Sequence, residues 1–147
     1  MFWMLFFLNL NLAAARVKQD EFLLLCDNKV NPVGVAVDEL TFSCLRNRLN
    51  PSGANQSYRI VVSSSYEKLI GGEYDCWDSG ILAGSDGYRI SYGGKKLPGS
   101  SSYYWRVQYG NAAKRAWTPV ASFVTAPLQS DWAGARWICY ANMPEAR

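Results

Sequence analysis

The sequence has 147 residues, of which 49% are hydrophobic and 18% are charged, and its formal net charge is +3. A chain of this length forms one domain of ordinary size with a real core, and it is too apolar for a disordered protein. Its positive charge is scattered, with Lys95-Lys96 and Lys114-Arg115 as isolated pairs, so we expect no nucleic-acid partner, which would require a clustered basic face.

The first fifteen residues, MFWMLFFLNLNLAAA, predict an export signal. Their apolar run ends in three alanines before Arg16, and a signal peptidase accepts small residues at this place. The run lacks Lys and Arg, and it is shorter than the ~20 residues of a membrane-spanning helix. We therefore expect residues 1–15 to be a signal peptide and the mature protein to be secreted or periplasmic, without membrane contact. A mis-assigned start codon and a membrane-tethered N-terminus are the alternatives.

The rest of the chain consists of short runs of β-branched, aromatic and aliphatic residues between turn-forming residues, which is typical of a β-sandwich. The segment 66–72, YEKLIGG, predicts one helical turn closed by glycine. With no long helix, the pattern predicts an all-β, seven-stranded antiparallel sandwich, immunoglobulin-like or fibronectin type III-like, over residues 16–128. The clearest strands are residues 23–26, 40–45, 57–63, 88–92, 103–109 and 121–125, and an aromatic residue followed by a turn occupies residues 76–80.

Alternation within these strands predicts the core, because successive side chains of a strand point to opposite faces. The segment 97–103 resembles the corner that leads into the sixth strand of such sandwiches. Tyr103 should therefore bury its ring and send its hydroxyl back to main-chain groups upstream. The predicted core residues are Tyr58, Ile60, Tyr103, Trp105, Val107 and Phe123.

The four cysteines, Cys26, Cys44, Cys76 and Cys139, allow three disulfide pairings that the sequence cannot rank. An immunoglobulin domain joins its second and sixth strands by a disulfide, but the sixth strand here carries Trp105, so the fibronectin type III-like variant fits better. We expect free buried or half-buried thiols, with a disulfide only in an exported protein. Without histidine or a C-x-x-C motif, a zinc site is not expected.

No catalytic residue, cofactor or metal ligand is expected. Glycoside hydrolysis needs two carboxyl groups that face each other across a sugar, and the acidic residues here fall mostly at ends and turns. The sequence has no histidine, no G-x-S-x-G motif and no glycine-rich phosphate loop, which argues against other common chemistries.

Five aromatic residues lie outside the clear inward positions or near turns: Trp77, Tyr104, Trp117, Trp132 and Trp137. Rings at such places either pack against neighbours, including the next domain, or stack on sugars. We favour packing, and an independent carbohydrate-binding module is the alternative.

Several motifs occur in one order along residues 22–140. They are Cys26 with Asn31-Pro32-x-Gly34, Phe42-Ser43, QSYRIVV at 56–62, Trp77-Asp78-Ser79-Gly80, YYWRV at 103–107, Trp117, Asp131-Trp132 and ARWI at 135–138. Together they resemble the N-terminal fibronectin type III-like region of bacterial α-L-rhamnosidases. Two departures are Cys44, where that family usually has tryptophan, and the missing proline-arginine pair before Phe42. The second strand is therefore expected to pack less well.

The resemblance implies a parent enzyme that removes terminal α-L-rhamnose from plant glycosides or polysaccharides, with its acids on a helical barrel far downstream. None of that barrel matches, so no catalytic residue is carried over. Residues 16–128 are then expected to be a non-catalytic structural module whose partners are the downstream domains. Residues 129–147 are expected to be the truncated start of the following β-domain, unable to fold stably without its other strands.

Overall fold

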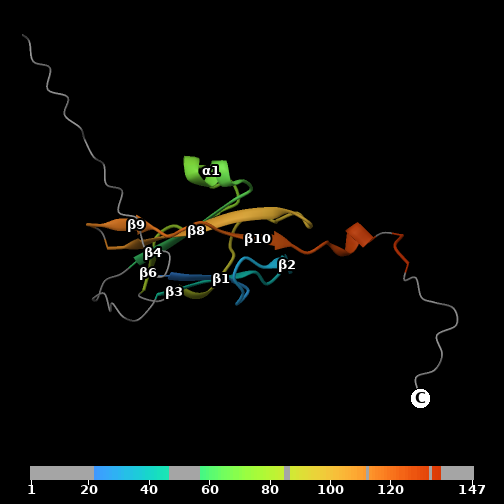
Figure 1. Ribbon diagram of the computed structural model, residues 1–147, viewed down its shortest axis with the longest axis horizontal. Helices are drawn as coiled ribbons and strands as arrows, with labels where there is room; N and C mark the ends of the chain where they lie inside the picture. The colour runs from blue at the N-terminus through green and yellow to red at the C-terminus, as the bar shows by residue number, and fades with distance from the viewer. Residues whose placement is uncertain (1–21, 47–56, 85–86, 112, 133, 137–147) are drawn as a thin grey trace, which may run out of the picture.

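The computed structural model describes residues 22–46, 57–84, 87–111, 113–132 and 134–136. Within them, ten strands and one short α-helix form two β-sheets that face each other (Figure 1). The expected signal peptide at residues 1–15 lies outside this part of the chain. In the described part, no helix is both long enough and apolar enough to cross a membrane.

The smaller sheet has three antiparallel strands in the order β1-β3-β7, which are β1 (Phe22–Cys26), β3 (Thr41–Arg46) and β7 (Gly87–Ser91). The pairing of β3 with β7 shifts register between Phe42 and Cys44. At the same place Arg89 has a φ of 52°, and its main-chain N–H donates to Ser43 Oγ at 3.0 Å. This irregularity bends the edge of the sheet.

The larger sheet has the order β2-β10-β8-β4-β5, and β6 and β9 pair with β4 and β8. Its strands are β2 (Val33–Val35), β4 (Ser57–Ser63), β5 (Trp77–Asp78), β6 (Leu82–Ala83), β8 (Ser102–Gly110), β9 (Arg115–Trp117) and β10 (Ala121–Thr125). The predicted all-β immunoglobulin-like sandwich is confirmed, and its expected strands agree with the structure to within one residue at each end. The pair β2 and β10 is parallel, while the other pairs are antiparallel.

The core lies between the two sheets and is rich in aromatic rings. Phe42 of the smaller sheet contacts Trp105 at 4.6 Å and Phe123 at 5.7 Å between ring centroids, and all three side chains are fully buried. Cys44 is also buried. The second strand thus places both Phe42 and Cys44 in the core, and its looser packing relative to the family stays a prediction.

The predicted core residues Ile60, Tyr103, Trp105, Val107 and Phe123 are all buried. Tyr58, the sixth, is only half-buried, and this part of the prediction is wrong. It lies near the beginning of β4, opposite Tyr109 at the end of the sandwich, and packs against the core from its edge.

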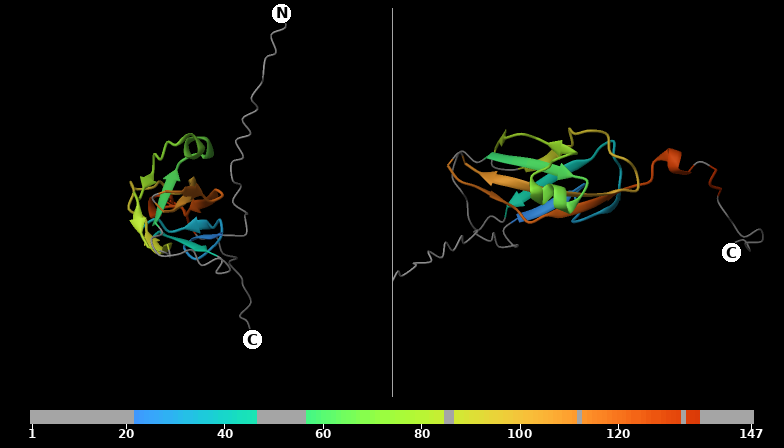
Figure 2. Two further views of the ribbon diagram at one scale, coloured as in Figure 1. Left: turned by 90° about the vertical axis from the view of Figure 1, so that its left-hand side faces the viewer. Right: turned by 90° about the horizontal axis from the view of Figure 1, so that it is seen from above.

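Helix α1 (Tyr66–Gly71) lies on the outer face of the larger sheet (Figure 2). Ser65 caps its first turn by accepting a hydrogen bond from the Lys68 N–H at 3.2 Å, and Gly72 ends it with a φ of 86°. Both are the residue types that favour these ends, because Ser accepts from free N–H groups and Gly adopts positive φ without strain. The buried residue of α1 is Leu69, which holds the helix against the sheet.

Candidate functional site

The W-D-S-G motif at residues 77–80 is a structural turn. Asp78 Oδ1 accepts hydrogen bonds from the Gly80 N–H at 3.0 Å and from Arg59 Nε at 2.8 Å. Ser79 pairs with Ile60 twice, because its N–H donates to the Ile60 carbonyl and its Oγ accepts from the Ile60 N–H. These hydrogen bonds attach the turn to β4. The polar side chains of Asp78 and Ser79 are therefore bonded to other groups of the same domain.

Trp77, the first residue of that motif, packs toward the core. Its ring lies 5.9 Å from Phe42 and 5.3 Å from Tyr92. The Tyr92 hydroxyl lies 2.9 Å from the Lys95 carbonyl oxygen and 3.1 Å from that of Cys76, so its single proton serves one of them at a time. Tyr92 is thus the tyrosine whose hydroxyl binds main-chain carbonyl groups at this place. Tyr103 stacks its buried ring on Phe123.

The strand sequence YYWRV at 103–107 alternates between the core and the outer face of the larger sheet. On the outer face, the Arg106 guanidinium lies over the Trp117 ring at 4.1 Å, and its Nη2 donates to the Leu69 carbonyl at 3.0 Å. Trp117 in turn lies 6.1 Å from the Tyr74 ring. The arginine therefore joins α1 to β9 across β8 by a cation–π contact and a hydrogen bond.

Three acidic residues near this face, Glu73, Asp75 and Asp78, form ion pairs with Lys68 or Arg59. Arg59 binds Asp78 through both of its carboxylate oxygens, and Lys68 binds Asp75 at 2.8 Å and Glu73 at 3.4 Å. Burial raises the pKa of Asp75, but hydrogen bonds from Lys68 and Ser64 outweigh it, so the pKa lies below its ordinary value. Such carboxylates stay ionised and are poor general acids.

The three described cysteines are free and buried, which agrees with the expected free thiols. Burial raises the pKa of Cys26 and Cys44 to about 12 and that of Cys76 to about 11. They are therefore protonated at neutral pH and unsuited to nucleophilic chemistry or metal binding. Cys139 lies outside the described residues. No group of three potential metal ligands occurs in the described part of the chain.

The candidate sugar-stacking residues do not form one platform. Trp77, Tyr104 and Trp117 are half-buried and contact other rings of the domain, with Tyr104 against Tyr66 at 6.1 Å. Trp132 is 56% exposed, and Trp137 lies outside the described residues. The favoured interpretation, packing against neighbouring residues, therefore holds for Trp77, Tyr104 and Trp117.

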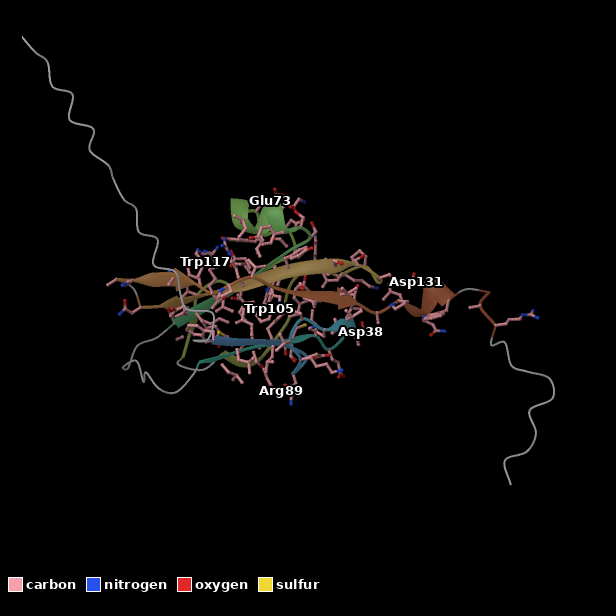
Figure 3. The ribbon with its side chains drawn as sticks, in the orientation of Figure 1. Asp38, Glu73, Arg89, Trp105, Trp117 and Asp131 are labelled. Carbon is pink, nitrogen blue, oxygen red and sulfur yellow. The ribbon has the colours of Figure 1, made fainter. Side chains whose placement is uncertain are left out.

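A hollow of about 350 Å³ lies beside the smaller sheet, between the 37–41 segment and β7. Its lining carries charges of both signs, with Asp38 and Glu39 on one segment and Arg89 on the other. Asp38 and Arg89 are labelled in Figure 3. Its Tyr92 hydroxyl is already bound to the main chain. The hollow thus brings together no catalytic pair and no ring platform.

The sequence motifs of this β-sandwich are thus used for packing within the domain. The family model for the Rha78A-like, N-terminal immunoglobulin domain matches residues 23–129. The chain belongs to this family. The resemblance to rhamnosidases that the motifs indicate is thereby confirmed.

Two curated relatives are α-L-rhamnosidases. One, from Formosa agariphila, is 32% identical over 125 residues that cover 83% of this chain and 13% of that protein. The other, from an Alteromonas species, is 34% identical over 113 residues that cover 74% of this chain and 12% of that protein. The solved α-L-rhamnosidase from Dictyoglumus thermophilum aligns with a TM-score of 0.65 and 29% identity, over 76% of this chain and 13% of that structure.

The chain spans about 13% of the length of the first curated relatives that it matches. The matched residues are the N-terminal immunoglobulin domain of the Rha78A-like family and not the catalytic domain of such an enzyme. The contacts of this domain that sequence reasoning missed include the Arg106–Trp117 pair, the ion pairs of Lys68 and the Arg59–Asp78 pair. Outward placement of Arg106 followed from strand alternation, but its partners on α1 and β9 carried no sequence signal.

Proposed function

We propose that this immunoglobulin-like domain is a non-catalytic structural module of an α-L-rhamnosidase-like glycoside hydrolase, which packs against the domains that follow it and holds them in place. The observation that carries the proposal is the use of the family motifs for internal packing. W-D-S-G forms a turn on β4, and YYWRV fills the core and fastens α1. None of these residues is left to form a reaction centre.

Within this proposal, the domain extends over residues 16–128, residues 129–147 lead into the following domain by way of the turn at Gln129–Trp132, and residues 1–15 direct export. The last strand of the sandwich, β10, ends at Thr125, which supports a boundary shortly after it. The apolar run and the three alanines before Arg16 support export.

A chimera tests the structural role. The whole 147-residue chain replaces the matching N-terminal region of the Formosa agariphila relative, and the half-life of α-L-rhamnosidase activity at elevated temperature is compared with that of the relative lacking this region. We expect a longer half-life in the chimera, because packed domains stabilise each other. A chimera carrying Trp105→Ala is the matched control and should lose the gain. Equal half-lives for the chimera and the shortened relative would contradict the proposal.

The second candidate function is carbohydrate binding, which the exposure of Trp132 favours. A titration of the isotope-labelled chain with L-rhamnose distinguishes it, by following the indole N–H signals in NMR spectra. We expect no shift of the Trp77, Trp117 or Trp132 signals at millimolar sugar. A saturable shift that disappears in one tryptophan-to-alanine variant would favour a carbohydrate-binding module.

A further inference from the structure

The chain is fastened to the sandwich for several residues beyond its last strand. At the end of β10, Thr125 Oγ1 accepts from the Ser101 N–H at 3.0 Å and lies 2.8 Å from the Pro98 carbonyl oxygen, to which it donates. One residue later, the Ala126 carbonyl accepts from the Ser100 N–H at 3.2 Å. The loop at 98–101, before β8, thus holds the segment that leaves β10.

A 3₁₀ turn, η1 (Gln129–Trp132), follows directly and is closed by a reciprocal pair of bonds. The Leu128 N–H donates to Asp131 Oδ2 at 2.7 Å, and the Asp131 N–H donates to the Leu128 carbonyl at 2.9 Å. A carboxylate that accepts from the free N–H before a helical turn stabilises that turn in the same way as a capping residue.

The turn rests on Gly99. A β-carbon placed on Gly99 would lie 2.8 Å from Leu128 N and 2.8 Å from Asp131 Oδ2. Atoms this close exclude any side chain there, so glycine is required by the approach of the two segments. The same β-carbon would also lie 2.8 Å from Leu128 Cγ, which shows that backbone and side chain both rest on this position.

Nothing in η1 serves the core of the sandwich, because none of its residues is buried. It lies beyond the end of the two sheets (Figure 1), and its last residue, Trp132, is 56% exposed. A large ring on a fixed support is suited to contact with another surface, since little conformational entropy is lost when it binds.

We propose that η1 is a preformed joint, closed by Asp131 and supported by Gly99, which presents Trp132 to the domain that follows in the chain and sets the orientation in which that domain packs. This inference rests on the proposed structural role and names the contact through which it acts. Support comes from the position of the turn shortly after β10, the bonds that fasten Thr125 and Ala126 to the 98–101 loop, the close approach of Gly99 to Leu128 and Asp131, and the exposure of Trp132.

Hydrogen exchange in the 147-residue chain tests the joint. We expect the Leu128 amide to be protected, and Asp131→Ala to reduce this protection by roughly five- to tenfold because one hydrogen bond to a carboxylate is lost. Asp131→Asn, which keeps an oxygen acceptor, should reduce it less. Gly99→Ala should also expose the amide. Gly71→Ala is the matched control, because a β-carbon on Gly71 meets nothing within 4 Å.

The chimera with the Formosa agariphila relative tests the contact. Trp132→Ala should shorten the activity half-life of the chimera at elevated temperature while leaving the unfolding midpoint of the 147-residue chain unchanged. Tyr66→Ala, which removes another exposed ring, from α1 on a different face, is the control and should leave the chimera's half-life close to its original value.

Three results would overturn the inference: an unprotected Leu128 amide, a Gly99→Ala variant with unchanged protection, or a Trp132→Ala chimera as durable as its parent. If the chimera still outlasts the relative that lacks the N-terminal region, the structural role stands and only the joint is refuted. If Trp132→Ala lowers the unfolding midpoint of the isolated chain as well, the ring belongs to this domain and is not a contact for the next.

Discussion

Strand β8 has one face toward the core and one toward α1, and the two faces are packed by different means. On the inner face, Trp105 and Val107 are fully buried among apolar side chains. On the outer face, the short helix α1 covers the sheet: its Leu69 and the neighbouring Val61 of β4 are also fully buried, and Arg106 of β8 holds the helix by a hydrogen bond. The inner face therefore depends on buried area, and the outer face depends on a few directed contacts.

This difference has a physical origin. A large area removed from water is stabilising without regard to exact geometry. A cation–π contact and one hydrogen bond contribute only when their groups stay in place. Substitutions on the inner face should therefore unfold the domain, whereas those on the outer face should loosen α1 first.

The largest expected effect is that of Trp105→Ala, which should lower the free energy of unfolding by about 3–5 kcal/mol through the cavity it leaves. Denaturant unfolding measures it. Trp105→Phe should cost much less, because Trp105 Nε1 has no hydrogen-bond partner among the described residues and only part of the ring volume is removed. Equal losses for the two variants would contradict a role based on buried volume.

Arg106→Ala should cost less, about 1–3 kcal/mol, since it removes the cation–π contact with Trp117 and the bond to the Leu69 carbonyl. Arg106→Lys should restore only part of the loss because an ammonium group cannot stack in the same plane. Hydrogen exchange should show faster exchange in α1 than in β4. If β4 and α1 exchange together in the variant, the two faces are not separable.

A double-mutant cycle sharpens the comparison. Arg106→Ala and Trp117→Ala should be less costly together than the sum of the two, with a coupling of about 1 kcal/mol. The reference is Arg106→Ala combined with Tyr92→Phe, because the two side chains bind different partners, and the losses of that pair should add. Additive losses for Arg106 and Trp117 would mean that their contact contributes nothing measurable.

Tyr92→Phe removes the hydroxyl that binds the carbonyl groups of Cys76 and Lys95, and should cost about 1 kcal/mol. The ring contact with Trp77 remains, so the core should be unchanged. Thermal unfolding with near-ultraviolet circular dichroism measures both. A changed aromatic spectrum would show that the hydroxyl also positions the core rings.

The smallest effect concerns pH. The pKa of Asp75 in the folded state lies below its ordinary value, so its contribution to stability is complete above the unfolded-state pKa and is lost as pH falls through the folded-state pKa. Asp75→Asn should therefore be less stable than the parent at neutral pH, and the difference should shrink on acidification. Unfolding midpoints at several pH values measure it, and a difference that is constant with pH would contradict the assignment.

Much of the fold was predictable because long alternating strands carry their own signal. Residues 57–63 and 121–125 were predicted with their observed bounds, and Ile60 and Phe123 were correctly placed in the core. Short strands gave no such signal. Strand β2 has three residues, with Gly34 at a φ of 80°, and it exists because β10 lies beside it, which no local pattern reveals.

The contacts of single side chains were harder to predict. Alternation placed Arg106 outward, but its partners lie on β9 and α1, and only the folded chain brings them together. In the same way, sequence indicated that a tyrosine hydroxyl returns to the main chain and assigned it to Tyr103, whereas the structure gives two such contacts to Tyr92. The support of η1 by Gly99 depends on a distance between loops, which residue type alone does not encode.

The parallel pairing of β2 with β10 has a mechanical consequence. The Val124 N–H donates to the Pro32 carbonyl at 2.9 Å, the Ala126 N–H donates to the Val35 carbonyl at 2.8 Å, and the Ser122 N–H donates to Asn31 Oδ1 at 2.9 Å. Tension in the chain reaches β2 from its N-terminal side and β10 from its C-terminal side. Because the two strands run in the same direction, that tension shears the three bonds simultaneously and cannot peel them apart one by one. We therefore expect the β2–β10 pair to separate at a higher force than a hairpin with the same number of bonds, in which the bonds break one after another.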